Sequence, residues 1–296
     1  MATSLADLIS RLRAAALDRP HYDTLSGPST LNNTDLTTAV TFSDGSSVGI
    51  GGIVDFDDAT FEAAYMRDKP TGATGTIVRG WESVTAAHVQ GCRLRLNPRY
   101  RAFQYRQALN AALGAIGAAF GRDVWDTTQT FSSSVRLIPV PATAKRVVEV
   151  ASNPSSPVLT TQLQRIPFDW MPSAPVALAS TGNAVRLIGK NPGSGTVYIH
   201  YQDAWPLLVN STDMLDPDYP PDAEDLITYG AEAWLLDSDT FALVAYQEPH
   251  VKQRQFGSAI NDVRAEFATA MQHFIQRRSE VAATRPGRSP SWLRGY

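Results

Sequence analysis

The chain has 296 residues, of which 43% are hydrophobic and 19% are charged, and its formal net charge is −3 at pH 7. This is an ordinary composition for a globular protein, and a chain of this length can bury a sizeable core. The small net charge gives the whole chain no electrostatic reason to bind nucleic acid or a membrane surface. The single cysteine, Cys92, excludes a disulfide framework and a thiolate zinc cluster, which suits a reducing cytoplasm.

Segment 4–17 predicts an amphipathic helix, because its apolar residues recur at the spacing of one helix face, and Pro20 ends it. Asp7, Arg11 and Arg13 interrupt the apolar run, so we do not expect a secretory signal peptide. No run approaches about 18 apolar residues, so we expect no membrane-spanning helix.

Segment 34–98 predicts an irregular β insert. Its short runs are β-branched or alternating, and Asp-Gly, Gly-Gly and Pro-Thr-Gly turn signals separate them. Within this insert, residues 58–66 could form a short helix.

Segment 100–120 predicts a second helix, and Gly121 stands where a left-handed residue can end it. Gly114 and Gly117 weaken this helix but would let another helix approach closely. The apolar residues recur at a spacing of four, three and four, at Leu109, Leu113, Ile116 and Phe120.

Segment 124–209 has the clearest β pattern, with six strand-like runs separated by Pro, Asn, Gly and Ser at the spacing of a β sandwich. Two further helices follow it, over 219–237 and about 251–282. Pro220–Pro221 and the acidic residues after it favour the start of the first of these helices.

These elements predict an α+β fold: a bundle of about four helices whose connections are expanded into β modules, because an isolated amphipathic helix must bury its apolar face. The expected domains are the bundle core (1–20, 100–122 and 219–283), an N-terminal β insert (34–98), a β-sandwich insert (124–209) and an extended C-terminal arm (284–296).

A search for catalytic and binding motifs identifies no catalytic residue, metal site or cofactor site. Gly189–Lys190 resembles the end of a phosphate-binding loop, but it lacks the first glycine and the hydroxyl residue of that motif. Glu82 and His88 could act as an acid/base pair, but a structural histidine in a turn explains them more simply. We interpret Cys92 as a small buried hydrophobic residue.

The acidic residues and the remaining histidines also lack the spacing of a metal site. No two histidines have the spacing of a helical zinc pair. The acidic pair at Asp57–Asp58 and the cluster within 213–218 miss the spacing of a calcium-binding loop, so helix capping and solvation explain them.

Large aromatic residues predict contacts with other subunits, because aromatics are enriched at the buried centres of protein–protein contacts. The alternative for the tryptophans in the β segments is that they cover the β core of their own chain. The candidates for contact or packing are Trp170, Trp205, Trp234, Phe256, Phe267 and Phe274.

The C-terminal arm combines positive charge with aromatic anchors, which is typical of a segment that folds on a partner. Nucleic-acid binding by this short arm and a frayed terminus remain as alternatives. Its candidate docking residues are Arg285, Arg288, Trp292, Leu293, Arg294 and Tyr296.

Two groups of motifs resemble the head-to-tail adaptors of tailed bacteriophages, also called connector or neck proteins. The first comprises 75–80 (GTIVRG), 85–88 (TAAH), Gly91 and 97–100 (NPRY), which resemble an RG…TAAAH..G…NPR run. The second is 221–231 (PDAEDLITYGA), which resembles a P…DLL.YGAA helix start. Trp81 and Glu82 depart from the small residues expected in the first run, which puts the local turn in doubt.

The resemblance implies a structural virion protein at the head–tail junction, assembled in the host cytoplasm and not an enzyme. Such a protein would form a ring of roughly twelve copies through head-to-tail contacts that close. Its C-terminal arm would dock on the portal protein, a stopper or tail protein would bind below, and genomic DNA would pass through the central channel without sequence-specific binding.

Two alternatives stay open. One is another neck or tail structural protein, such as a stopper, a tail terminator or a minor tail protein. The other is a sugar-binding or hydrolytic tail protein built on the β sandwich, which would need two carboxylates about 5–10 Å apart in a cleft.

Overall fold

The computed structural model describes residues 3–15, 20–58, 60–81, 83–131, 136–152, 164–188, 195–245 and 253–283. The chain divides into two compact units, each described by itself. Unit 1 comprises Met1–Leu113 and Leu207–Arg277, and unit 2 comprises Gly114–Pro206 and Arg278–Tyr296.

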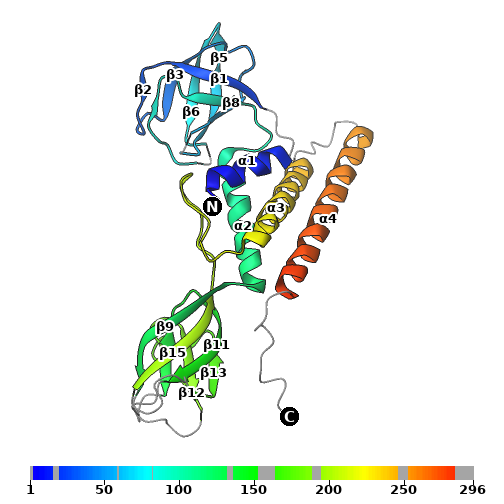
Figure 1. Ribbon diagram of the computed structural model, residues 1–296. Coiled ribbons are helices and arrows are strands. Elements are labelled where there is room, and N and C mark those ends of the chain that lie inside the picture. Colours follow the sequence, from blue (N-terminus) through cyan, green and yellow to red (C-terminus); the bar gives the residue numbers. More distant parts are fainter. Residues whose placement is uncertain are drawn as a thin grey trace. The chain divides into compact units, whose positions relative to one another are not determined.

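The N-terminal half of unit 1 is a closed barrel of six antiparallel strands in the order β1-β3-β6-β5-β4-β8 (Figure 1). A two-stranded sheet, β2 with β7, accompanies it. The barrel strands are β1 (His21–Gly27), β3 (Thr37–Phe42), β4 (Ile53–Phe56), β5 (Ala63–Thr71), β6 (Thr74–Arg79) and β8 (Arg93–Leu96); the other two are β2 (Thr30–Leu31) and β7 (His88–Val89).

The barrel buries its own apolar core. Alternate residues of β3 and β6 point inward, as their burial patterns show, and β1 pairs with β8 to close the sheet. Closure leaves no strand edge of the barrel unpaired. Its core comprises Leu25, Leu31, Val40, Phe42, Val48, Val54, Phe56, Ala64, Met66, Ile77, Leu94 and Leu96.

The helices of unit 1 begin with α1 (Leu5–Ala15) and continue with the first part of α2 (Ala102–Ala119). A short 3-10 turn, η1 (Pro221–Ala223), leads into α3 (Glu224–Ala245), and α4 (Gln253–Ala283) follows. Helix α3 approaches α2 and α4 closely at Gly230, where an added Cβ would lie 2.9 Å from both Ala112 Cβ and Phe274 Cε2.

Unit 2 contains two antiparallel sheets with one shared apolar core, to which β10, β11, β14 and β15 all contribute side chains. The sheet of order β12-β11-β15-β9 consists of β12 (Gln164–Arg165), β11 (Ala144–Ser152), β15 (Gly195–Asp203) and β9 (Arg122–Phe131). The sheet of order β10-β14-β13 consists of β10 (Leu137–Val140), β14 (Asn183–Leu187) and β13 (Phe168–Met171).

The expected helical bundle with inserted β modules is wrong. The described chain is mostly β, with four α-helices and a closed six-stranded antiparallel barrel. The physical reason is that the short runs of the N-terminal β segment bury their apolar side chains inside their own barrel. These strands therefore form a domain core of their own and are not insertions that pack on the helices.

Two local expectations also differ from the structure. The described residues within 58–66 form no helix; β5 begins at Ala63 and pairs with β4 and β6. Gly121 was expected to end the helix in a left-handed conformation, but it is not among the described glycines with a positive φ. A side chain is excluded there for lack of space, because an added Cβ would lie 2.2 Å from the Asp203 carbonyl oxygen. Among the described residues, no helix has the length and apolar character needed to cross a membrane.

Candidate functional site: a buried histidine–carboxylate cluster

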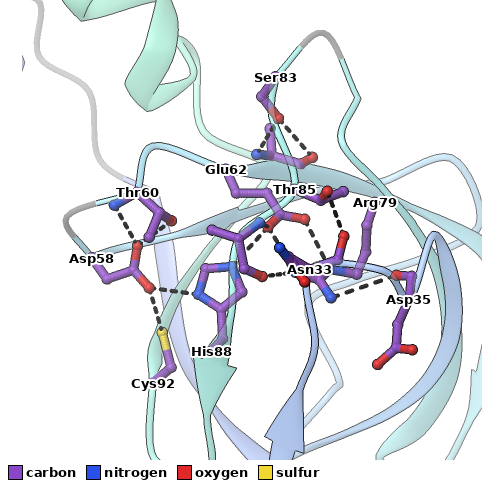
Figure 2. A network of polar contacts seen from close by, with 12 residues as sticks. Asn33, Asp35, Asp58, Thr60, Glu62, Arg79, Ser83, Thr85, His88 and Cys92 are labelled. Atoms are coloured by element: carbon purple, nitrogen blue, oxygen red, sulfur yellow. Dashed lines mark hydrogen bonds and ion pairs between the residues drawn. The ribbon is translucent and has the colours of Figure 1, made fainter. Parts of the chain in front are cut away.

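Five side chains of the barrel meet in one polar network, which we call the His88 cluster: Asp58, Glu62, Arg79, His88 and Cys92 (Figure 2). The two carboxylates lie in the segment that joins β4 to β5. Arg79 is the last residue of β6, His88 belongs to β7, and Cys92 directly precedes β8. The network therefore connects four separate segments of the barrel.

Arg79 and Glu62 form a bidentate ion pair, and both side chains are fully buried. Arg79 Nε lies 2.9 Å from Glu62 Oε1, and Nη2 lies 2.8 Å from Oε2. The guanidinium also donates to the carbonyl oxygens of Asn32 and Ala86, while the Ala86 N–H donates to Glu62 Oε2 at 2.7 Å. A buried ion pair needs this many partners, because unsatisfied charge in the interior is very costly.

His88 lies between two carboxylates, and its side chain is fully buried. Nδ1 is 2.6 Å from Asp58 Oδ2, and Nε2 is 2.9 Å from Glu62 Oε2. The ring stacks on Phe56 with a centroid separation of 3.8 Å. Burial alone would lower the pKa of His88, but the hydrogen bonds with Asp58, Cys92 and Glu62 outweigh it and raise this pKa to about 10.

Asp58 forms the outer side of the cluster, with its side chain 29% exposed. The Thr60 backbone N–H and hydroxyl both donate to Oδ1, at 2.9 and 2.6 Å. On Oδ2, Cys92 Sγ approaches to 3.6 Å beside the His88 ring. Burial would raise the pKa of Asp58, but the hydrogen bonds from His88 and Thr60 prevail and lower it to about 2.

The cluster is balanced in charge: two carboxylates face one guanidinium and one imidazolium. The pKa of Glu62 is also lowered, since its hydrogen bonds to His88, Arg79 and Ala86 outweigh its burial. A general acid or base works best with a pKa near the operating pH. None of these pKa values is shifted toward neutral pH. The arrangement therefore suits stabilisation of the barrel by hydrogen bonds and ion pairs better than proton transfer.

A second buried ion pair connects the barrel to the start of α2. Asp55 Oδ2 accepts hydrogen bonds from Arg95 Nη1 at 3.2 Å and from the Ala102 N–H at 2.8 Å, and both side chains of the pair are fully buried. Burial raises the pKa of Asp55 to about 7 against the opposing effects of Arg95 and the Ala102 N–H. Asp55 thereby caps the first turn of the helix.

Sequence reasoning identified His88 but not its partners. Glu82, a possible acid/base partner that the simpler interpretation of a structural histidine does not require, lies outside the described residues, and the histidine contacts Asp58 and Glu62. These carboxylates lie 30 and 26 positions away in the chain, so local spacing contains no signal of the contact. Cys92 is half-buried against the barrel core, as a small hydrophobic residue would be, but its sulfur also faces Asp58.

The predicted contact residues of unit 2 lie in different surroundings. Trp205 is buried and donates its indole N–H to the Phe120 carbonyl oxygen at 2.9 Å. Trp170 is half-buried and packs against the sandwich core. These tryptophans thus cover the core of their own chain, which was the alternative interpretation.

The predicted contact residues of the helices differ in their exposure to solvent. Phe274 is buried and Phe267 packs beside a small apolar cluster of α3 and α4, whereas Trp234 is exposed. The side chain of Phe256 lies outside the described part of the chain, as do the arm residues Arg285, Arg288, Trp292, Leu293, Arg294 and Tyr296.

Gly189, Lys190 and Asn191, which resemble part of a phosphate loop, also lie outside the described residues. No family model matches this chain, and no curated protein matches it.

Proposed function

We propose that this chain is a structural protein of the neck of a tailed bacteriophage, a head-to-tail adaptor. It forms a ring below the portal protein, joins the DNA-filled capsid to the tail and surrounds a central DNA channel. The proposal combines the sequence resemblance with the roles that the matching residues have in the structure.

The residues of the first motif group serve internal stability. Arg79 and His88 belong to the His88 cluster, and both backbone groups of Ala86 bond to it. Their side chains stabilise the barrel from within and do not project toward a substrate. This use of the motif suits a scaffold better than a catalytic centre.

The second motif group surrounds a close helix contact. Gly230, in the YGA sequence, lies where α3 approaches Ala112 of α2 and Phe274 of α4. A larger residue would separate these helices, so this glycine has a packing role. Both groups of resembling residues therefore have structural explanations that require no substrate.

The observation that carries the proposal is the exposure of large apolar side chains on both units. Trp81, Trp125 and Trp234 are 40%, 46% and 36% exposed in the single chain. Aromatic side chains are enriched where subunits meet, so these three tryptophans are candidates for contacts between copies. Further exposed apolar residues are Leu36, Ile50, Val84, Val89, Val176, Leu178, Leu207, Val209, Met214 and Ile275. A closed ring of identical chains would cover part of this surface.

The hydrolytic alternative is less well supported. A glycoside hydrolase needs one carboxylic acid that remains protonated near neutral pH and a second carboxylate beside it. The His88 cluster lies in unit 1 and not in the sandwich, and the pKa of both Asp58 and Glu62 is lowered, which is the opposite of what that acid requires. Asp55, whose pKa is raised, is fully buried under the first turn of α2.

Electron microscopy of the tag-free protein, alone and mixed with its portal, tests the proposal. We expect a closed ring of roughly twelve copies bound end-on to the portal. A hexameric ring that binds the tail side would instead favour a terminator or another tail protein. A strict monomer that turns over cell-wall sugar would overturn the proposal.

Deletion of Ser289–Tyr296 tests the role assigned to the arm. We expect the shortened chain to fold and form rings but to lose attachment to the portal. The matched control keeps the same residues in scrambled order, which preserves length and charge and should also fail to attach. Attachment of the shortened chain to the portal would contradict the docking role. Attachment of the scrambled chain, but not of the shortened chain, would show that the arm binds through its charge and not through its sequence.

A further inference from the structure

We propose that Asp58, His88 and Cys92 form a binding site for one zinc ion. This site goes beyond the proposed adaptor function and does not depend on it. Each residue offers one ligand atom, and the three atoms lie within 4.8 Å of one another. They combine a carboxylate oxygen, an imidazole nitrogen and a thiol sulfur, a mixed donor set that suits zinc better than magnesium or calcium.

Two of the three distances between ligand atoms can be compared with those of a tetrahedral site. Zinc bonds of about 2.0–2.3 Å place neighbouring ligand atoms roughly 3.2–3.7 Å apart. Cys92 Sγ and Asp58 Oδ2 are already 3.6 Å apart. The 2.6 Å between His88 Nδ1 and Asp58 Oδ2 is a hydrogen-bond distance, and it must lengthen by about 0.7 Å when zinc replaces the shared proton.

The surrounding residues orient two of the three ligands. Glu62 Oε2 lies 2.9 Å from His88 Nε2 and can accept its N–H, so Nδ1 is the ring nitrogen that faces Asp58 and would bind the metal once its proton is displaced. Arg79 in turn fixes Glu62 through two hydrogen bonds. A histidine that binds a metal almost always donates its other ring N–H to a carboxylate, a backbone carbonyl or water, and Glu62 is such a partner.

Asp58 is oriented in a similar way. Thr60 donates two hydrogen bonds to Oδ1, so Oδ2 is the oxygen that faces His88 and Cys92. The residues behind the three ligand atoms therefore already have the arrangement that a metal site requires.

Access and charge are also suitable. Asp58 and Cys92 are partly exposed, while the His88 side chain is fully buried. A metal could enter from the Asp58 side, and water could complete the coordination. Zinc would displace one proton from the imidazole and one from the thiol, which adds two positive charges and removes two. The net charge of this buried region therefore stays the same.

Metal titration of the full-length, tag-free protein tests the site. After treatment with a chelator and dialysis, we expect calorimetry and elemental analysis to find about one zinc per chain. Cobalt in place of zinc should produce a thiolate-to-metal charge-transfer absorption in the near ultraviolet. Absence of bound zinc, or a cobalt spectrum without the thiolate band, would overturn the proposal.

Two ligand variants and one control test the assignment of the ligands. Cys92→Ala should remove the thiolate band, and Asp58→Asn should lower zinc affinity at least tenfold. The matched control is His200→Gln in unit 2, because His200 Nε2 also faces a carboxylate, 3.5 Å from Asp123 Oδ1, and should leave zinc binding unchanged. Circular dichroism shows whether each variant folds. Full zinc binding by folded Cys92→Ala or Asp58→Asn would contradict the site, and the cobalt spectrum of the unaltered protein decides the matter if both variants unfold.

Thr60→Val tests the orientation of Asp58 without removing a ligand. Loss of the hydroxyl donor should weaken zinc binding about 10–100-fold and leave the amount bound at saturation unchanged. An unchanged affinity would show that this residue does not support the site.

Discussion

At the residue scale, Arg79 and Glu62 stabilise the barrel only together. Both side chains are completely buried, and each satisfies the charge of the other. Removal of one partner from such a pair is far more costly than the pair itself is stabilising, because the remaining charge is left in the interior. Glu62 also accepts hydrogen bonds from His88 and from the Ala86 N–H, so the stability of two further segments depends on this pair.

Replacement of Arg79 tests this dependence. We expect Arg79→Met to lower the free energy of unfolding by about 3–5 kcal/mol, because Glu62 would remain buried without its guanidinium. Urea denaturation followed by circular dichroism measures the loss. The control is Arg11→Met: Arg11 pairs with Glu224 at 3.1 Å but is 54% exposed, so its loss should cost less than about 1 kcal/mol. Equal effects of the two substitutions would contradict the role of burial.

The His88 cluster also predicts a pH dependence in chelator-treated protein. The folded pKa of His88, about 10, lies above its ordinary value of 6.5. The folded protein therefore keeps a proton that the unfolded chain releases, and stability falls as pH rises through this range, by at most about 1.4 kcal/mol per pH unit. The pKa of Asp58 is about 2, below its ordinary 3.8, so its contribution is lost as pH falls through the acid range.

Comparison with His88→Gln isolates this effect. The stability difference between the two proteins should be largest between about pH 4 and 6.5 and should shrink toward pH 10. Urea denaturation at about pH 5, 7 and 9 measures the difference, which includes the response of the contacting carboxylates Asp58 and Glu62 to the loss of His88. A difference that does not change with pH would show that His88 is not held as a cation.

At the scale of elements, two helical glycines have opposite roles. Gly230 of α3 faces Ala112 and Phe274 so closely that an added Cβ would be only 2.9 Å from each. Nothing lies within 4 Å of the corresponding position at Gly114 of α2. Space, and not helix propensity, therefore decides which of the two residues must be glycine.

Alanine substitution separates these roles. Gly230→Ala should destabilise the protein by about 1–3 kcal/mol through crowding, although alanine is the better helix former. Gly114→Ala should stabilise it by about 0.5–1 kcal/mol, because only the propensity changes. Thermal denaturation of the two variants checks the signs, and the same sign for both would refute this account of the helix contact.

At the scale of the whole molecule, the chain contains two compact units with separate cores, the barrel core in one and the sandwich core in the other. Local stability follows local packing, so a change in one core should affect its own unit most. This gives the protein two cooperative regions that can be measured separately.

Matched core truncations test this independence. Leu94→Ala in the barrel and Ile199→Ala in the sandwich each remove a buried aliphatic side chain, which typically costs about 2–5 kcal/mol. Hydrogen–deuterium exchange with mass spectrometry should show lost protection only in the unit that carries the substitution. Equal loss of protection in both units after either substitution would show one cooperative core.

The sequence by itself determined the local elements of this protein. Apolar spacing predicted a helix over 100–120, which is observed as Ala102–Ala119, with Leu109, Leu113, Ile116 and Phe120 all buried. The proline pair and acidic residues after 219 correctly indicated a helix start. Periodicity succeeds here because each helix face depends on neighbours three and four residues away.

Only the tertiary structure decided how these elements combine. Closure of the barrel depends on pairing between β1 and β8, and the His88 cluster brings together residues 26 and 30 positions apart. Gly121 is required by the distant carbonyl of Asp203 and not by a helix cap. Alternating residues specify which side of a strand faces inward, but they do not specify which strand lies beside it. That choice belongs to the packing of the folded chain.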